Sequence, residues 1–210
     1  MDVASAAISP FEPSTVLVRE FFKVDQESIR RVKMRLMKES GNETMMEKSV
    51  TTFEALVACV WRPRARALQL NNEGKTTLIV TMGMRGHLDP PLPNGYYGNA
   101  ISDAYVTLTM KELNERPLLE VMKVIGETKK AALNAEHIKN EIDTTYPSLE
   151  YFNKFGFAFM RMTDWRHLGF MENQDYEGSK LVDQRGEVYP CDSRKWGVET
   201  ALELGARRIS

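Results

Sequence analysis

Three histidines are the residues of this chain best suited to proton transfer: His87, His137 and His167. An imidazole can take a proton from a hydroxyl, most effectively when a carboxylate orients the ring. None of the three has an aspartate four residues further on, but His87 stands near Asp89 in a His-Leu-Asp run. An ordinary loop position is the favoured interpretation for His87, and a solvated surface position for His137. His167 either faces a cleft or packs at a strand end, so the sequence names no catalytic residue.

No other motif completes a catalytic or metal site. The chain lacks Gly-x-Ser-x-Gly and Gly-x-x-x-x-Gly-Lys-Ser/Thr. Cys59 and Cys191 lie far apart without metal-ligand spacing, which predicts no metal site and a reducing compartment, the cytoplasm. Arg62, Arg64 and Arg66 form a basic cluster, which either meets a phosphate-bearing ligand or, as we favour, is solvated at a helix end.

Residues 90–100 (PPLPNGYYGNA) form the most informative segment. The prolines stiffen the backbone, and Gly95 and Gly98 allow another segment or a ligand to approach closely. Tyr96 and Tyr97 offer large, partly polar contact surfaces. Taken without further context, this segment is more simply a tight loop between two strands than a ligand site.

Composition limits the classes of protein to which the chain can belong. The 28 basic and 29 acidic side chains nearly cancel over 210 residues, which argues against a nucleic-acid binder. No apolar run approaches the roughly 20 residues that a membrane span needs. The first 13 residues lack the charged and apolar regions of a secretory signal.

Mixed helix and strand patterns position these residues and predict an α/β or α+β layer fold. Residues 1–14 are expected to be a loose leader. Asp25 caps a first helix, and Thr51 with Glu54 forms the capping box of a second, which Pro63 should kink or end early. We expect strands at residues 15–24, 77–84, 100–109 and 157–163, a single long helix at about 115–138, and a short helix at 198–204.

Several linked blocks together resemble the plant BAHD acyltransferases, which transfer an acyl group from coenzyme A to an alcohol or amine. The blocks are residues 19–33 (REFFKVDQESIRRVK), 53–68 (FEALVACVWRPRARAL), Arg85, 89–100 (DPPLPNGYYGNA) and 163–170 (TDWRHLGF). Their order and spacing match the family over roughly residues 12–171. Within the family, the sequence of these blocks most resembles the members that acylate alcohols.

The resemblance implies a fold like chloramphenicol acetyltransferase, with two similar α/β domains and a channel between them. Residues 1–70 would be the end of the N-terminal domain with its leader, residues 75–171 part of the C-terminal domain, and residues 172–210 a divergent tail. The family holds no permanent cofactor and uses acyl-CoA as a co-substrate. Its partners are acyl-CoA and a small hydroxyl- or amine-bearing acceptor, without nucleic acid or membrane, and full-length relatives are expected to be monomeric.

The resemblance also carries site residues over to this chain. Arg85 matches an arginine after a strand, Gly98 and Asn99 match a Gly-Asn pair near the channel, and Thr163 and Trp165 match a Thr/Ser-x-Trp strand end on the coenzyme A side. An ion pair for Arg85 and core packing for Trp165 are equally good interpretations.

Two departures bear on activity. The family's His-x-x-x-Asp motif, whose histidine deprotonates the acceptor, does not occur in this chain. The Asp-Phe-Gly-Trp-Gly motif, whose aspartate pairs with the arginine at the Arg85 position, is replaced by NQDYEGSK at residues 173–180. We therefore expect an acyltransferase family member that is inactive and poorly soluble as an isolated chain. The alternative is a non-catalytic relative that binds acyl-CoA or a partner chain.

Overall fold

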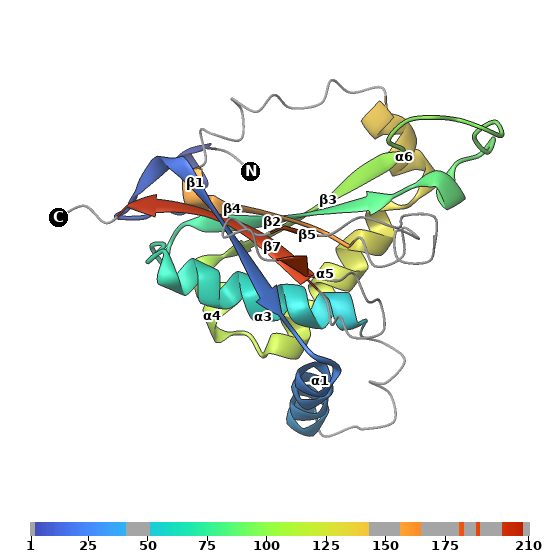
Figure 1. Ribbon diagram of the computed structural model, residues 1–210. Helices are drawn as coiled ribbons and strands as arrows, with labels where there is room; N and C mark the ends of the chain where they lie inside the picture. Colours follow the sequence, from blue (N-terminus) through green and yellow to red (C-terminus); the bar gives the residue numbers. More distant parts are fainter. Residues whose placement is uncertain are drawn as a thin grey trace.

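A computed structural model of the chain describes residues 3–40, 51–142, 156–164, 181–182, 188–189 and 199–207. Helices and strands are mixed along these residues, as predicted (Figure 1). In chain order the elements are η1 (Val3–Ser5), β1 (Glu12–Lys23), α1 (Gln26–Ser40), α3 (Thr52–Ala67), β2 (Lys75–Gly83), η2 (Arg85–His87), β3 (Ile101–Thr109), α4 (Met110–Glu115), α5 (Leu118–Ala132), α6 (Ala135–Ile142), η3 (Gly156–Ala158), β4 (Phe159–Thr163), β5 (Leu181–Val182), β6 (Val188–Tyr189) and β7 (Glu199–Arg207).

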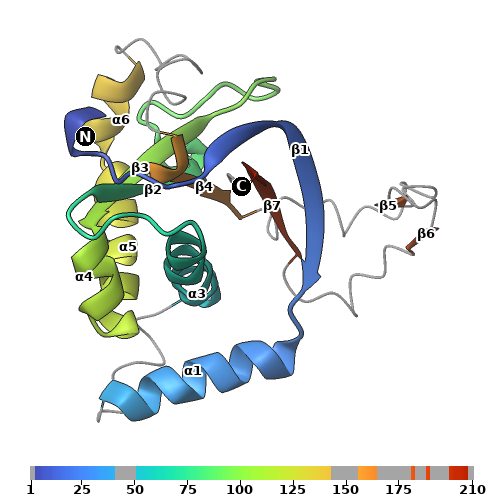
Figure 2. The same cartoon turned by 90° about the vertical axis from the view of Figure 1, so that its left-hand side faces the viewer.

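A sheet with the strand order β3-β2-β4 organises the fold. The central strand β2 runs antiparallel to β3 and parallel to β4. Helices α3, α4 and α5 lie together on one side of this sheet (Figures 1 and 2). Because successive side chains of a strand point to opposite faces, each strand presents one set of residues to these helices and another set away from them.

The apolar side chains on the helix-facing side of the sheet form the core. They are Leu78, Val80, Ala104, Val106, Leu108, Met160 and Met162. Trp61 of α3 is fully buried against this face, and its indole N–H donates to Thr76 Oγ1 at 3.2 Å. The Thr76 hydroxyl in turn donates to the carbonyl of Ala158 at 2.8 Å. Helix and sheet therefore share one core, in which the buried indole N–H of Trp61 and the hydroxyl of Thr76 are both paired.

This core extends across residues 70–75, where the resemblance placed a change of domain. Trp61 and Ala65 on one side of that position pack with Leu78 and Val80 on the other. Packing in the described residues is therefore continuous across residues 70–75 and does not locate a domain boundary there. The boundary stays a prediction from the resemblance.

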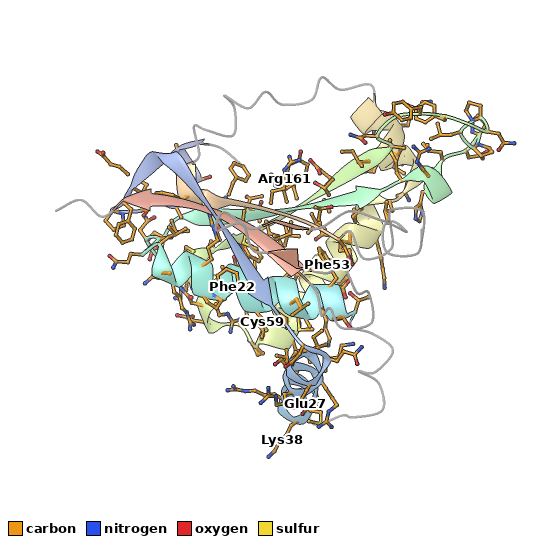
Figure 3. All side chains as sticks on the ribbon, viewed as in Figure 1. Phe22, Glu27, Lys38, Phe53, Cys59 and Arg161 are labelled. Carbon is orange, nitrogen blue, oxygen red and sulfur yellow. The ribbon has the colours of Figure 1, made fainter. Side chains whose placement is uncertain are left out.

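Helix α3 begins as the sequence predicted. The Glu54 backbone N–H donates to Thr51 Oγ1 at 3.2 Å, and the Thr51 backbone N–H donates to Glu54 Oε2 at 2.9 Å. Phe53 lies near the start of this helix and Cys59 near its middle (Figure 3). Of the two outcomes expected for Pro63, an early end of the helix is wrong, because the helix continues to Ala67, and a kink stays a prediction. Buried residues on both sides of the exposed Pro63 hold the helix against the core, which offsets the lost backbone hydrogen bond.

The arginines of α3 are not merely solvated, so the favoured interpretation of that cluster is wrong. Arg62 Nη2 donates to the carbonyl of Arg116 at 2.6 Å, and Arg64 Nη1 donates to the carbonyl of Phe157 at 3.1 Å. Arg66 Nε donates to Asn114 Oδ1 at 2.8 Å. Burial lowers the pKa of Arg64 to about 10. The cluster therefore ties α3 to the segments around α4 and η3.

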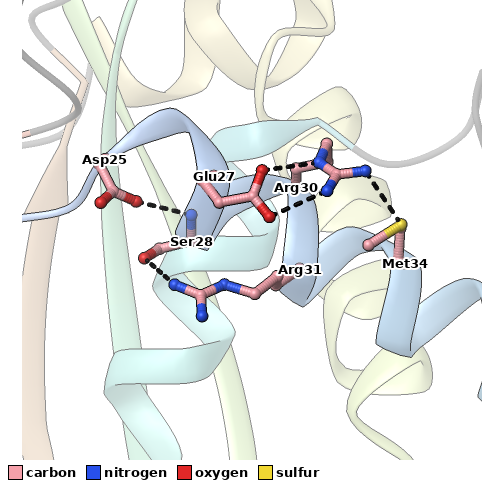
Figure 4. A network of polar contacts seen from close by, with 6 residues as sticks. All are labelled: Asp25, Glu27, Ser28, Arg30, Arg31 and Met34. Atoms are coloured by element: carbon pink, nitrogen blue, oxygen red, sulfur yellow. Dashed lines mark hydrogen bonds and ion pairs between the residues drawn. The ribbon is translucent and has the colours of Figure 1, made fainter.

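Helix α1 is capped and lined by polar side chains (Figure 4). The Ser28 backbone N–H donates to Asp25 Oδ1 at 2.7 Å, which confirms Asp25 as the predicted cap. Arg30 forms two hydrogen bonds with Glu27, at 2.8 and 2.9 Å, and Arg31 reaches Ser28 Oγ at 3.1 Å. Because these pairs are exposed, they contribute little to stability.

The expected loose leader is instead packed. Ala7 is buried, and its backbone N–H donates to the carbonyl of Lys75 at 2.8 Å. The Ile8 N–H donates to Asn71 Oδ1 at 2.6 Å. A side chain on Gly74 would place its Cβ 2.2 Å from the Cα of Ala7, so the segment docks only because Gly74 has none. Small residues that suggested a tail in fact permit this close approach.

Two helix predictions were also wrong. The single helix expected at about 115–138 is two helices, α5 from Leu118 to Ala132 and α6 from Ala135, with a break at Leu133–Asn134. Residues 199–207 form strand β7, antiparallel to β1, in place of the expected final helix. In so short a segment, hydrophobic spacing does not distinguish a strand from a helix, and pairing with β1 decides the structure.

Candidate functional site

The predicted site residues gather at one end of the sheet. The parallel strands β2 and β4 finish there, and β3 starts there, because the register places Thr81 opposite both Thr163 and Asp103. Residues 85–100 connect β2 to β3 at this same end. The strand order and register therefore bring Arg85, the Gly98–Asn99 pair and Thr163 to the same end of the sheet. Trp165 lies outside the described residues.

Arg85 holds the connecting loop in place. Its Nη2 donates to the Gly98 carbonyl at 2.5 Å and its Nη1 donates to the Tyr96 carbonyl at 3.4 Å. The guanidinium carbon also lies 5.4 Å from the centroid of the Tyr96 ring. The ion pair considered for Arg85 is not present among the described residues. A loop contact takes its place, and the position of the missing Asp-Phe-Gly-Trp-Gly aspartate lies outside the described residues.

Glycines give this loop its shape. Gly95 has a φ of 81°, which disfavours any residue with a side chain. A Cβ on Gly98 would lie 3.2 Å from the Tyr96 ring, so Gly98 leaves room for that ring beneath Arg85. Asn99 is exposed, and the Tyr97 side chain is entirely exposed. The loop therefore presents Asn99 and Tyr97 to its surroundings while Arg85 and Tyr96 fix its conformation.

The sheet face turned away from α3, α4 and α5, which we call the open face, carries a polar network that the sequence did not predict. Its side chains alternate with those of the core and include Thr77, Ile79, Thr81, Asp103, Tyr105, Thr107, Phe159, Arg161 and Thr163. Asp103 is fully buried on this face. Its Oδ1 accepts a hydrogen bond from Thr81 Oγ1 at 2.6 Å, and its Oδ2 lies 3.0 Å from Nη2 of Arg161.

The Arg161 side chain is 43% exposed, although the Asp103 side chain that it contacts is 0% exposed. The ion pair crosses the central strand, since Asp103 belongs to β3 and Arg161 to β4. A single charged residue in a strand matches no sequence motif, so the sequence did not single out Asp103 or Arg161. Only the strand register shows that their side chains lie on the same face. Thr163 follows Arg161 by two positions, and therefore lies on the same face.

The histidines do not form a base–acid pair in the described part of the chain. His87 is exposed in η2, and no hydrogen bond joins it to Asp89. His137 is exposed on α6, as expected, and His167 lies outside the described residues. An open hollow of about 540 Å³ separates η2 from α6 and is lined by His87, Leu88, Asp89, Ala135, Glu136, Ile138 and Lys139. The hollow is open to solvent and is lined by side chains of both charges, so its lining does not indicate a particular class of ligand.

The described residues contain no cluster of three or more His, Cys, Asp or Glu side chains that could hold a metal ion. Within the same residues, no helix is long and apolar enough to cross a membrane. Cys59 is a free, partly buried thiol on α3, and Cys191 lies outside the described residues. Burial raises the pKa of the Cys59 thiol, which keeps it in its less reactive protonated form.

Solved structures define the class of fold. F. sporotrichioides TRI101 complexed with coenzyme A and T-2 superposes with a TM-score of 0.53 at 15% identity, over 97% of this chain and 44% of its own length. Vinorine synthase superposes with a TM-score of 0.52 at 16% identity, over 77% of this chain and 36% of its own length. At that identity the likeness concerns the fold alone. It confirms the predicted chloramphenicol-acetyltransferase-like α/β fold, present here in part.

Sequence comparison then gives the family. Residues 4–196 match the model of the Transferase family, and the chain belongs to that family, as the resemblance to BAHD acyltransferases predicted. Spermidine coumaroyl-CoA acyltransferase of Arabidopsis thaliana is 36% identical over 94% of this chain and 42% of its own length. Spermidine sinapoyl-CoA acyltransferase of the same plant is 37% identical over 84% of this chain and 39% of its own length. The chain thus spans about two fifths of these relatives, and the match continues beyond residue 171, where the predicted resemblance ended.

Proposed function

We propose that this chain supplies part of the channel wall of an acyl-CoA-dependent acyltransferase that acylates a small hydroxyl- or amine-bearing acceptor. Membership of the family carries this proposal. The geometry supports it, because Arg85, Gly98, Asn99 and Thr163 meet at one end of the sheet beside the polar open face.

The reaction needs a base, and the family's motif for that base is absent from this sequence. The acceptor gives up its proton, its oxygen or nitrogen attacks the thioester carbonyl, and the thiolate of coenzyme A leaves. The chain contains no His-x-x-x-Asp motif, and His87 has no carboxylate partner among the described residues. We therefore expect no transfer by the isolated chain, since loss of a general base costs about 10²–10⁴-fold in rate.

The names of two relatives favour an amine as the acceptor, because both are called spermidine acyltransferases. Other relatives are named as O-acyltransferases, so an alcohol remains the second acceptor class. Acyl-CoA would be a co-substrate, not a resident cofactor. A cytoplasmic site of action is part of the same proposal, as is a monomeric full-length protein.

A chimaera tests this function directly. The chain is joined to a segment that supplies the family's His-x-x-x-Asp motif, and release of free thiol is followed with coumaroyl-CoA and either spermidine or a primary alcohol. We expect turnover by the chimaera and none by the isolated chain or by a matched chimaera with His→Ala in the motif. Full activity of the isolated chain would refute the missing-base argument.

The second candidate is a non-catalytic relative that binds acyl-CoA, and the missing motif is the observation that favours it. A folded chimaera that binds coenzyme A but transfers to neither acceptor would support this candidate over the first. A chain that does not bind coenzyme A at all would contradict both.

A further inference from the structure

We infer that Arg161 is an oxyanion-binding residue on the open face of the sheet and that Asp103 orients it. The inference rests on the proposed function and specifies its substrate chemistry. The oxyanion would be either a phosphate of coenzyme A or a carboxylate of the small acceptor. Each presents a pair of oxygens that a guanidinium group can contact through two parallel hydrogen bonds.

The burial of Asp103 is the first step of the argument. A carboxylate that is 0% exposed is costly unless it is paired, and here Thr81 Oγ1 at 2.6 Å and Arg161 Nη2 at 3.0 Å both contact it. An apolar pair of the same volume would hold the strands together equally well. What the charged pair adds is a fixed direction for the guanidinium group.

The exposure of Arg161 is the second step. Its side chain is 43% exposed although its partner is completely buried, so the ion pair does not enclose it. It lies on the same face as Thr163, the residue that resembles the coenzyme A side of the family's channel. Arg161 and Thr163 are on consecutive same-face positions of β4, which places them close enough to contact one ligand.

The sign of the charge is the third step. Asp103, the acid of the pair, is buried, and Arg161 is the member that reaches the surface. At the surface the pair therefore presents guanidinium N–H donors, which suit an anionic oxygen and do not suit the ammonium groups of a polyamine. If the acceptor is spermidine, as for two relatives, its ammonium groups must bind elsewhere in the channel and Arg161 must serve the coenzyme A.

The test measures binding to the whole chain by ligand-observed NMR at low salt. Two pairs of probes separate the sources of the oxyanion: coenzyme A with pantetheine, which lacks the phosphates, and 4-hydroxybenzoate with the neutral 4-hydroxybenzamide. The variants are R161Q, R161K and D103N. The matched control is R30Q, which removes an arginine from another Arg–carboxylate pair, on exposed α1.

We expect R161Q to weaken binding of coenzyme A or of 4-hydroxybenzoate by about tenfold or more, and to leave the neutral probes unchanged. The probe that loses affinity identifies the oxyanion. R161K should weaken binding less than R161Q, because it keeps the charge without the planar fork. D103N should also weaken binding while R30Q should not. Thermal melts show which variants are folded at the temperature of the titration. If D103N does not fold, the comparison of R161K with R161Q still tests the role of the guanidinium group.

Two results would overturn the inference and differ in their meaning for the function. If coenzyme A binds the natural chain and R161Q binds both charged probes equally well, Arg161 only joins β3 and β4, and the proposed function survives. Equal losses for charged and neutral probes lead to the same conclusion. If coenzyme A does not bind the natural chain, the proposed function fails as well.

Discussion

Replacing Glu54 with Gln should destabilise the fold by removing one charge between two helices. Glu54 of α3 is 6% exposed, and its Oε1 accepts from Lys129 Nζ of α5 at 3.0 Å. Its Oε2 accepts from the Thr51 backbone N–H at 2.9 Å. A glutamine keeps an acceptor oxygen for Thr51 and nearly the same shape beside Gly126, so the variant isolates the effect of the ion pair.

The magnitude follows from the burial of this pair. Hydrogen bonds to charged groups contribute about 1.5–3 kcal/mol. Lys129 retains 20% of its side-chain exposure, and its ammonium group also lies 5.0 Å from the centroid of the Phe53 ring, which partly keeps it satisfied after the substitution. We therefore expect a loss of about 1–2 kcal/mol in the free energy of unfolding at pH 7.

The loss should depend on pH in a defined direction. Burial is the largest single influence on the pKa of Glu54 and raises it, but hydrogen bonds from the Thr51 backbone and from Lys129 together hold it below its ordinary value of 4.5. A carboxyl whose folded pKa is lowered stabilises the fold above its unfolded pKa, and this contribution disappears as the pH falls through the folded value. The difference between the natural chain and E54Q should therefore shrink below about pH 4.5.

Urea unfolding followed by circular dichroism from pH 7 to pH 3 measures this difference. The control is E27Q, which removes an exposed carboxylate paired with Arg30 and should change stability far less. A difference for E54Q that stays constant with pH, or an equal loss for E27Q, would refute the assignment of a stabilising Glu54–Lys129 ion pair.

Three further predictions concern the core. Thr76→Val should lower the free energy of unfolding by about 1–3 kcal/mol, since it leaves the indole N–H of Trp61 without its partner; urea unfolding measures this, and an unchanged midpoint would contradict it. Gly74→Ala should detach the N-terminal segment, because the new Cβ would lie 2.2 Å from the Cα of Ala7, and faster hydrogen exchange at the Ala7 amide reports the detachment. Because burial raises its thiol pKa, Cys59 should react slowly with thiol reagents in the folded chain at pH 7 and much faster in urea; equal rates would argue against its burial.

Local signals predicted the elements whose boundaries depend on local chemistry. The capping box at Thr51 and Glu54 and the cap at Asp25 both occur in the structure as predicted. The strands β2, β3 and β4 follow from their β-branched and apolar residues. These features were predictable because each depends on residues within one or two turns of the chain.

Three of the errors share one physical origin, which is contact between distant segments. The N-terminal segment packs directly against Gly74, and residues 199–207 form a strand because they pair with β1. Likewise, the arginines of α3 find carbonyl partners around α4 and η3. None of these partners lies close in sequence, so no local pattern could indicate them.

The candidate site was predicted unevenly. The resemblance selected Arg85 and Gly98, and the structure joins them directly at 2.5 Å. Asp103 and Arg161 were missed, because their association depends on the register of three strands. The sequence offered one signal, a single charged residue within each of two predicted strands, 100–109 and 157–163, but it did not show that the two residues share a face.

The most direct test of the account is to map where coenzyme A binds. Coenzyme A is titrated into the ¹⁵N-labelled chain, and amide chemical shifts are followed at every assigned position. Our account predicts shifts concentrated at the sheet end formed by residues 81–103 and 159–163. Saturable shifts that cluster on α1, or a complete absence of saturable shifts, would contradict the claim that this edge is the wall of an acyl-CoA channel.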